Sequence, residues 1–146
     1  MQLTRHTDIA LRVLLLLADT GADGLTAEQV AMRFRVNRNH LAKVVQTLAR
    51  AGFITAKRGV GGGLVMARAA TQINLGDIVR QLEPELDLLE CFSPKTSTCP
   101  ITDACRLQRV LKKAMAAFFA VLDQTTLADL MGPHGELTRR LAGLKI

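Results

Sequence analysis

Apolar residues recur at helical spacing along most of the chain, and this pattern predicts a mainly α protein. Residues 9–18 are apolar nearly all round, which indicates a buried first helix with Thr7 as its candidate N-cap. A second helix is expected over 27–34, because Thr26 and Gln29 have the spacing of a capping box. Both helices are short enough to belong to a compact module.

A third helix is expected over 38–50, with Asn37 as its N-cap and Gly52 just past its end. Its apolar positions form one stripe and its polar positions another. The apolar stripe is Leu41, Val44, Val45 and Leu48, and the polar stripe is Asn39, Lys43, Gln46 and Arg50. Two short helices, a tight turn and a polar face without any acid are typical of a helix-turn-helix.

A glycine-rich segment, 59–63, follows the third helix and lies between two β-prone runs, which predicts a hairpin. Lys57 and Arg58 lie just before its tip. A basic hairpin directly after a helix-turn-helix is typical of a wing, whose arginine can enter a minor groove. The alternative, a phosphate-binding loop, is disfavoured because the GxxxxGK[ST] pattern is missing.

The segment after the wing predicts a connection to a long helix. Asn74 can cap a helix over 75–82, which the Glu83-Pro84 pair should end. The four acids within 83–90 indicate a solvated linker. Beyond the long helix we expect one or two helical turns over 126–131, and past Pro133 little order except over 137–144.

The long helix is expected to start at Ala104, and its apolar residues step alternately by three and four. This predicted seam is Ala104, Leu107, Leu111, Ala114, Phe118 and Val121, with Thr125 at the next step. Three heptads of this kind indicate pairing with a second copy of the chain. Such a homodimer would fit a palindromic site with half-sites about 34 Å apart. The alternative is a helix packed within its own chain on the first helix.

The 146 residues fit one domain with a helical extension, and 49% hydrophobic content suffices for a core. The longest apolar stretch, 13–18, is too short for a membrane span, and no signal peptide is recognisable, so a cytoplasmic protein is expected. The net charge is +6, and residues 1–68 carry all of it, with ten Lys or Arg and four acids. This asymmetry favours a polyanion-binding module, although a merely basic surface is the alternative.

All three cysteines, Cys91, Cys99 and Cys105, fall within fifteen residues. Their number excludes a disulfide framework, and their clustering indicates iron–sulfur or zinc ligation. Cys105 is expected in the first turn of the long helix, where a thiolate is stabilised. A fourth ligand must come from elsewhere, or one metal stays open. A cysteine enzyme is disfavoured, because the three histidines lie far from the cysteines in sequence.

Several motifs together carry a family resemblance that extends from residue 1 to about 131. They are Met-Gln-Leu-Thr-Arg-His-Thr-Asp-Ile-Ala-Leu-Arg at the start, Asn-Arg-Asn-His-Leu-Ala-Lys-Val-Val, Lys-Arg-Gly-Val-Gly-Gly-Gly, the Glu-Pro pair and Cys-Pro-Ile-Thr-Asp-Ala-Cys-Arg-Leu. The chain resembles the NsrR and IscR group of iron–sulfur transcription regulators. Within that group it is most similar to the nitric-oxide-sensing NsrR branch.

The resemblance implies roles for individual residues. The three cysteines match the cluster thiolates, and Asp8 matches an acid that reaches across the dimer as fourth ligand to a [4Fe-4S] cluster in some NsrR proteins. The matching DNA-binding residues are Asn37, Arg38, Asn39, His40 and Lys43 in the reading helix, and Arg58 and Gly61 in the wing. Gln108 stands where the IscR branch carries a histidine, which argues against IscR-type [2Fe-2S] ligation. The first cysteine gap is seven residues rather than five, so a [2Fe-2S] cluster remains the alternative.

These inferences divide the chain into five regions: a winged helix-turn-helix over 1–68, a linking helix and acidic linker over 69–90, a cluster-binding loop over 91–105, a dimerisation helix over 104–125 and a tail over 126–146. The expected function is a homodimeric repressor, not an enzyme, that loses its operator DNA when nitric oxide damages the cluster. A regulator of the same fold that senses iron, cluster status or redox stress is one alternative. A zinc-containing or metal-free DNA-binding protein is the other.

Overall fold

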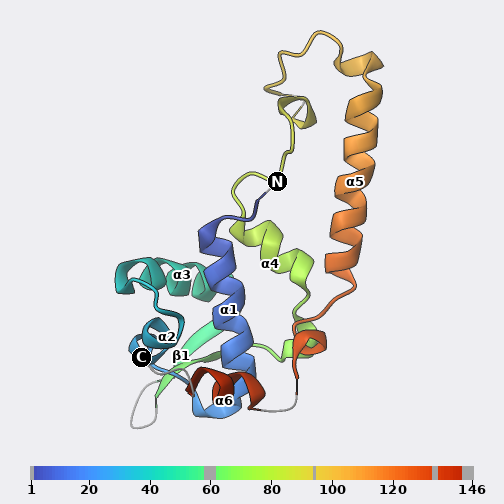
Figure 1. Cartoon of the computed structure of the whole chain (residues 1–146). Coiled ribbons are helices and arrows are strands. Elements are labelled where there is room, and N and C mark those ends of the chain that lie inside the picture. Colours follow the sequence, from blue (N-terminus) through green and yellow to red (C-terminus); the bar gives the residue numbers. More distant parts are fainter. Residues whose placement is uncertain (1, 58–61, 94, 133–134, 143–146) are drawn as a thin grey trace.

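The computed structural model describes residues 2–57, 62–93, 95–132 and 135–142, and it shows a helical protein with one hairpin (Figure 1). Its helices and strands are α1 (Arg5–Thr20), α2 (Ala27–Phe34), α3 (Arg38–Arg50), β1 (Ile54–Lys57), β2 (Gly63–Met66), α4 (Leu75–Leu82), α5 (Arg106–Asp123) and α6 (Glu136–Ala142). The predicted mainly α fold with a winged helix-turn-helix is confirmed.

Side-chain caps determine where the helices of the winged module begin. The hydroxyl of Thr26 accepts the amide of Gln29, whose side chain accepts the amide of Thr26, so the predicted capping box is confirmed. The side chain of Asn37 likewise caps α3. The prediction for α1 was wrong, because Thr4 is the cap and accepts the amide of Thr7 at 3.3 Å. Thr7 itself is fully buried within the first turn.

Helix α1 forms the centre of the core, and α3, α4, α6 and β2 pack around it. The predicted apolar stripe of α3 is largely confirmed, since Leu41, Val44 and Leu48 are buried and Val45 is half-buried. The two strands pair antiparallel, and Leu64 of β2 also exchanges backbone hydrogen bonds with Leu25. The wing is therefore fastened to the segment that follows α1.

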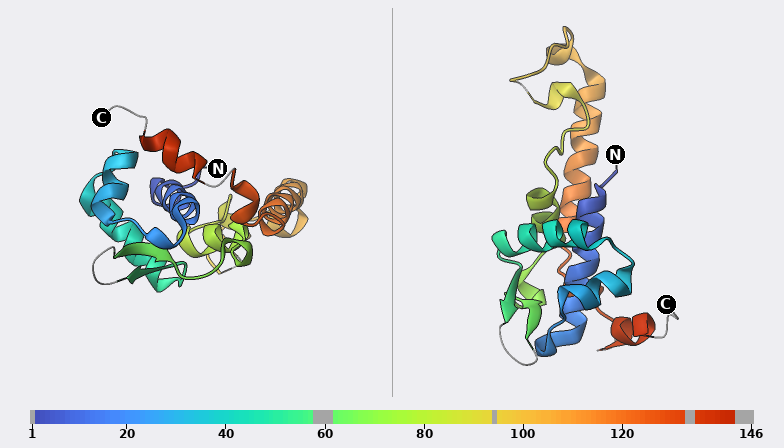
Figure 2. Two further views of the ribbon diagram at one scale, coloured as in Figure 1. Left: turned by 90° about the horizontal axis from the view of Figure 1, so that it is seen from below. Right: turned by 90° about the vertical axis from the view of Figure 1, so that its left-hand side faces the viewer.

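Helix α5 extends away from the winged module and carries the cysteine loop at its far end (Figures 1 and 2). It begins at Arg106 with Cys105 as its N-cap, so the predicted start at Ala104 was wrong. Ala104 ends a separate short 3-10 helix, Thr102–Ala104. The main contacts of α5 are with α4 and with the turn Glu90–Phe92. No described helix has the length and apolar character needed to cross a membrane.

The apolar face of α5 differs from the predicted seam. Leu111 and Phe118 are half-buried, and Phe118 lines a cavity of about 210 Å³ together with residues of the 83–88 segment and the N-terminus. The exposed apolar residues instead form a neighbouring stripe: Leu107, Val110, Ala114, Ala117 and Val121. Two of the six apolar residues of the predicted seam, Leu111 and Phe118, are therefore partly covered by the chain itself, and this apolar stripe is left uncovered.

The C-terminal segment folds back on α1, where it forms α6 close to the expected helical stretch. The buried carboxylate of Asp19 accepts the amides of Gly135 and Thr138 at 3.0 and 2.7 Å, and the Thr138 hydroxyl at 2.6 Å. Leu137 and Leu141 pack against the core. A buried acid near the end of α1 thus anchors the first turn of α6.

Candidate DNA-reading surface and cysteine loop

The amino-terminal half of α3 presents the predicted DNA-reading residues. Asn37, Arg38, Asn39 and Lys43 are exposed, and His40 is half-buried. The Asn37 side chain accepts hydrogen bonds from the amides of Asn39 and His40, so it serves as the N-cap of α3. Arg38 forms an ion pair with Glu28 of α2. Arg58 and Gly61, the two predicted wing residues, lie outside the described residues.

His40 is held from behind by α1. Its ring stacks on that of His6, with the ring centroids 6.2 Å apart and the planes inclined by 28°. Burial lowers the pKa of His6, and the nearby His40 lowers it further, whereas Glu83 acts in the opposite direction. A neutral His6 at neutral pH therefore lies against the recognition helix. Sequence reasoning missed this contact, because residues 34 positions apart give no local sign of it.

Glu83 links the same end of α1 to the segment that leads to the cysteines. Its carboxylate accepts the backbone amide of Thr4 at 2.8 Å and the Thr4 hydroxyl at 3.2 Å. The expectation that the whole 83–90 run is solvated was therefore wrong at its first residue, which is buried. The other three acids of the run are exposed. Glu83 ties the linker to α1 next to the reading surface.

Gln108 joins two of the three cysteines. Its side-chain amide donates to the carbonyl of Cys91 at 2.6 Å, and its backbone amide donates to Sγ of Cys105 at 3.4 Å. Gln108 is buried although it is polar, as is Cys91, whereas Cys99 and Cys105 are half-buried. The residue that distinguishes the chain from the IscR branch thus organises the loop around the first turn of α5.

The cysteine loop has the donor chemistry of a soft-metal site. All three thiols are free, and Cys105 lies at the N-terminus of α5, where its sulfur accepts the backbone amide of Gln108. Among the described residues, however, no three His, Cys, Asp or Glu side chains are placed to share a metal ion. Thiolates are suitable donors for the cluster, and binding it would require the loop to bring the three sulfur atoms together.

The structure does not bring Asp8 to the cysteines. Asp8 lies in the first turn of α1, and its carboxylate pairs with Arg12 one turn later at 2.7 Å. Nearly half of the Asp8 side-chain surface is exposed. Asp8 is therefore accessible to a second protein chain, and any metal ligand would have to compete with Arg12 for its carboxylate.

Replacing Gln108 with leucine should loosen the cysteine loop. The leucine leaves the buried carbonyl of Cys91 without its donor, and an unpaired buried polar group costs about 1–3 kcal/mol. We expect amide hydrogen exchange to accelerate over 90–93 while the protection of α3 stays unchanged. Gln124→Leu, an exposed glutamine at the other end of α5, is the matched control. Equal exchange in all three proteins would contradict the role of Gln108.

Comparison with known proteins supports a regulatory function. The Rrf2 family model, described as an iron-dependent transcriptional regulator, matches residues 3–133. The HTH-type transcriptional regulator NsrR of Halalkalibacterium halodurans is 44% identical over 138 residues, which are 94% of each chain. NsrR of Shouchella clausii is 44% identical over 132 residues, covering 90% of this chain and 89% of the relative.

Solved structures agree with this assignment. CymR, the global cysteine regulator of B. subtilis, is 25% identical with a TM-score of 0.70, covering 89% of this chain and 95% of CymR. T. potens IscR is 26% identical with a TM-score of 0.69, covering 89% of this chain and 85% of IscR. These relatives are named as regulators, which confirms the prediction of a transcriptional regulator rather than an enzyme. The chain belongs to the Rrf2 family of transcriptional regulators.

Proposed function

We propose that the chain is a homodimeric, iron–sulfur-dependent repressor that releases its operator when nitric oxide damages the cluster. One observation carries this proposal: the loop with three free cysteines is anchored on α5 in a chain that is 44% identical to two NsrR proteins. The [4Fe-4S] form is the cluster we favour, and [2Fe-2S] is the alternative. The five regions expected from the sequence keep their roles in this proposal.

DNA binding would use α3 and the wing. The exposed polar face of α3 fits a major groove, and the hairpin beside it can reach the adjoining minor groove. Because residues 1–68 carry the whole positive excess, phosphate contacts should supply much of the affinity. Two such modules on a dimer axis would read a palindromic operator.

Cys91, Cys99 and Cys105 would hold the cluster, with Asp8 of a second copy as the fourth ligand. When bound, the cluster supplies an iron atom that reacts with nitric oxide, and a carboxylate holds that iron less firmly than a thiolate would. Without the cluster, Asp8 would pair with Arg12, its partner in this structure. Once the cysteines are released, the 83–105 segment is constrained mainly by Glu83 and Gln108. The Glu83 contact lies at the start of α1, which packs on α3, whereas the Gln108 contact lies at the far end of α5.

Native mass spectrometry of anaerobically purified protein, before and after nitric oxide, tests this function. We expect a dimer with four irons and four sulfides per chain, which nitric oxide degrades, together with loss of DNA binding. Asp8→Ala should leave the fold intact and loosen or convert the cluster. Two irons per chain would favour an iron- or redox-sensing relative, and zinc or no metal would favour the metal-free alternative. DNA affinity unchanged by nitric oxide would refute nitric oxide sensing.

Lys43→Ala should weaken binding to all DNA sequences by a similar factor. Lys43 is exposed on the reading face, where its ammonium would neutralise a phosphate. The loss of one such contact should lower the slope of log affinity against log salt by about one. Lys113→Ala, an exposed lysine on α5, is the matched control and should leave the slope unchanged. If Lys43→Ala keeps the wild-type slope, Lys43 does not contact phosphate.

A further inference from the structure

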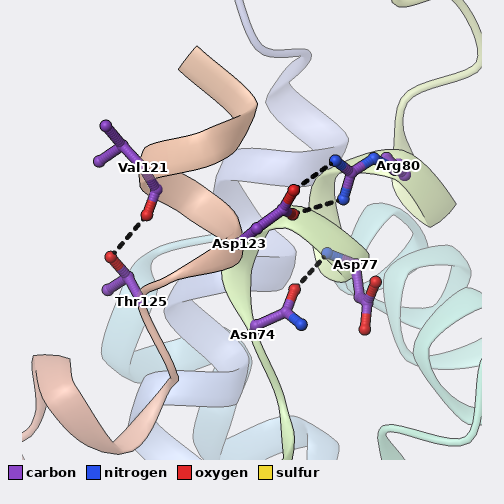
Figure 3. A network of polar contacts seen from close by, with 6 residues as sticks. All are labelled: Asn74, Asp77, Arg80, Val121, Asp123 and Thr125. Atoms are coloured by element: carbon purple, nitrogen blue, oxygen red, sulfur yellow. Dashed lines mark hydrogen bonds and ion pairs between the residues drawn. The ribbon is translucent and has the colours of Figure 1, made fainter. Parts of the chain in front are cut away.

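The carboxyl end of α5 is joined to α4 by a two-bonded ion pair between Arg80 and Asp123 (Figure 3). The Arg80 guanidinium donates to both carboxylate oxygens of Asp123, at 2.6 and 2.8 Å. The same guanidinium lies over the Phe119 ring, 4.4 Å from its centroid. Hydrogen bonding to Arg80 holds the pKa of Asp123 below its usual value, so the pair stays charged at neutral pH. We call Arg80, Asp123 and Phe119 the α4–α5 clamp.

Gly76 makes room for this clamp. A β-carbon at position 76 would lie 1.8 Å from Oδ1 of Asp123 and 2.7 Å from a guanidinium nitrogen of Arg80. Only glycine therefore lets the carboxylate approach the first turn of α4 this closely. The clamp is a close contact that depends on one small residue, in contrast to a flexible surface ion pair.

The backbone reinforces the same joint. The amide of Leu75 donates to the carbonyl of Thr125 at 3.0 Å, and the amide of Leu127 donates to the carbonyl of Ile73 at 2.8 Å. Leu127 is fully buried in the core of the winged module. The first residue of α4, Leu75, is thus bonded to the segment after α5, and Glu83, which follows the last turn of α4, is bonded to Thr4 before α1. These bonds thus connect the winged module to the carboxyl end of α5.

A small rotation at this joint would move the far end of α5 a long way. The helix has 18 residues and is about 27 Å long at 1.5 Å per residue. The exposed apolar stripe runs along α5. In a dimer that pairs through this stripe, the angle between α4 and α5 would decide where the two winged modules lie relative to each other. The side chains of Arg80 and Asp123 are 41% and 42% exposed, and ion pairs that water reaches contribute little to stability. The main effect of the ion pair should therefore be on the angle between α4 and α5.

We propose that the α4–α5 clamp positions the two recognition helices of the dimer and thereby sets the half-site spacing that the protein accepts. Arg80 and Asp123 are positioning residues, because they act through the direction of α5 and contact no DNA. This role rests on the proposed function. It adds a determinant of operator choice that lies away from every base-contacting residue.

A distance measurement within one chain tests the geometric step. Nitroxide labels carried by unnatural amino acids would replace Ala49 of α3 and Ala116 of α5, both exposed, so the native cysteines stay intact. Labelled chains are diluted in excess unlabelled protein, so that pulsed electron resonance reports distances within a chain. We expect a narrow distribution in the wild type, a clearly broader one in Arg80→Ala and Asp123→Ala, and an intermediate one in Arg80→Lys. The double variant should be no broader than either single one, because both remove the same contact.

Arg140→Ala removes an exposed ion pair within α6 and is the matched control, which should keep the narrow distribution. Thermal unfolding of each variant verifies that the winged module is folded. If Arg80→Ala and Asp123→Ala keep the wild-type distribution, the clamp does not set the direction of α5 and the proposal is overturned.

The spacing step uses duplexes selected by the wild-type protein from a random pool, with the half-site spacer then changed by one or two base pairs. We expect the wild type to lose about tenfold in affinity for each shift, and Arg80→Ala to lose less than about threefold. If the wild type discriminates between spacers and Arg80→Ala does so equally, this inference alone fails. If the wild type selects no DNA, the proposed function fails first.

Discussion

Placing a glutamate at Ala114 should convert the protein from a dimer into a monomer and lower its affinity for a two-half-site operator at least about a hundredfold. Ala114 lies at the middle of the apolar stripe on α5. The three large members of that stripe, Leu107, Val110 and Val121, are 61%, 62% and 65% exposed within one chain. Apolar surface left open along one line of a helix is typical of an interface.

The expected size of the effect follows from desolvation. In a helix pair the Ala114 position would lie against its counterpart, away from water, so two carboxylates would be buried close together. Burying an unpaired charge costs several kcal/mol, and each 1.4 kcal/mol is a tenfold change in an equilibrium constant. A monomer has one recognition helix and can therefore contact only one of the two half-sites.

Ala116→Glu provides the matched control, because Ala116 is exposed on the opposite side of α5. The control should remain a dimer and bind DNA like the wild type. Sedimentation equilibrium gives the oligomeric state, and fluorescence anisotropy with a labelled operator gives the affinity. A dimeric Ala114→Glu protein would show that the stripe is not the interface, and the homodimer would then need another surface.

The winged module was largely predictable from the sequence, because the signals that build it are local. The Thr26 capping box and the Asn37 cap lie within four residues of the amides they bind, and the periodicity of α3 places Leu41 and Leu48 in the core. The α1 cap was misplaced by three residues. Thr4 and Thr7 are both acceptable caps, and the burial of Thr7 decides between them.

Contacts between distant segments were not predictable in the same way. Two residues of the predicted seam of α5, Leu111 and Phe118, are half-buried by the chain itself, and nothing in the helix alone shows this. Glu83 read as a solvated acid, and its partner Thr4 lies 79 positions away. Such pairings depend on the tertiary fold, which a pattern of residue types along the chain does not contain.

The candidate site shows the same division. The cysteines were identified by residue type and clustering, whereas the bridge that Gln108 makes between two of them required the structure. The Asp8–Arg12 pair was within reach of the sequence, since residues four apart on a helix are neighbours. The wing residues Arg58 and Gly61, and the cluster ligation as a whole, stay predictions.

Substitutions of Cys105 can distinguish loss of helix capping from loss of metal binding, because this residue has a role in both. As the N-cap of α5 its sulfur accepts the amide of Gln108, and as a proposed ligand it supplies one of three thiolates. Serine is one of the best N-caps and a poor ligand for an iron–sulfur cluster, whereas alanine can serve in neither role. The two substitutions should therefore agree in one measurement and differ in the other.

Cys105→Ser and Cys105→Ala should both lose the iron and sulfide of the anaerobic protein. In metal-free protein, urea unfolding should show the alanine variant about 1 kcal/mol less stable than the serine variant. Thr26→Ala removes the cap of α2, far from the cysteines in sequence, and should lower stability by a similar amount with its iron content intact. Retention of iron by Cys105→Ser would remove Cys105 from the ligand set. Equal stability of the two Cys105 variants would show that the sulfur does not cap α5 in solution, and the ordering of the loop would then rest on Gln108 and its bond to Cys91.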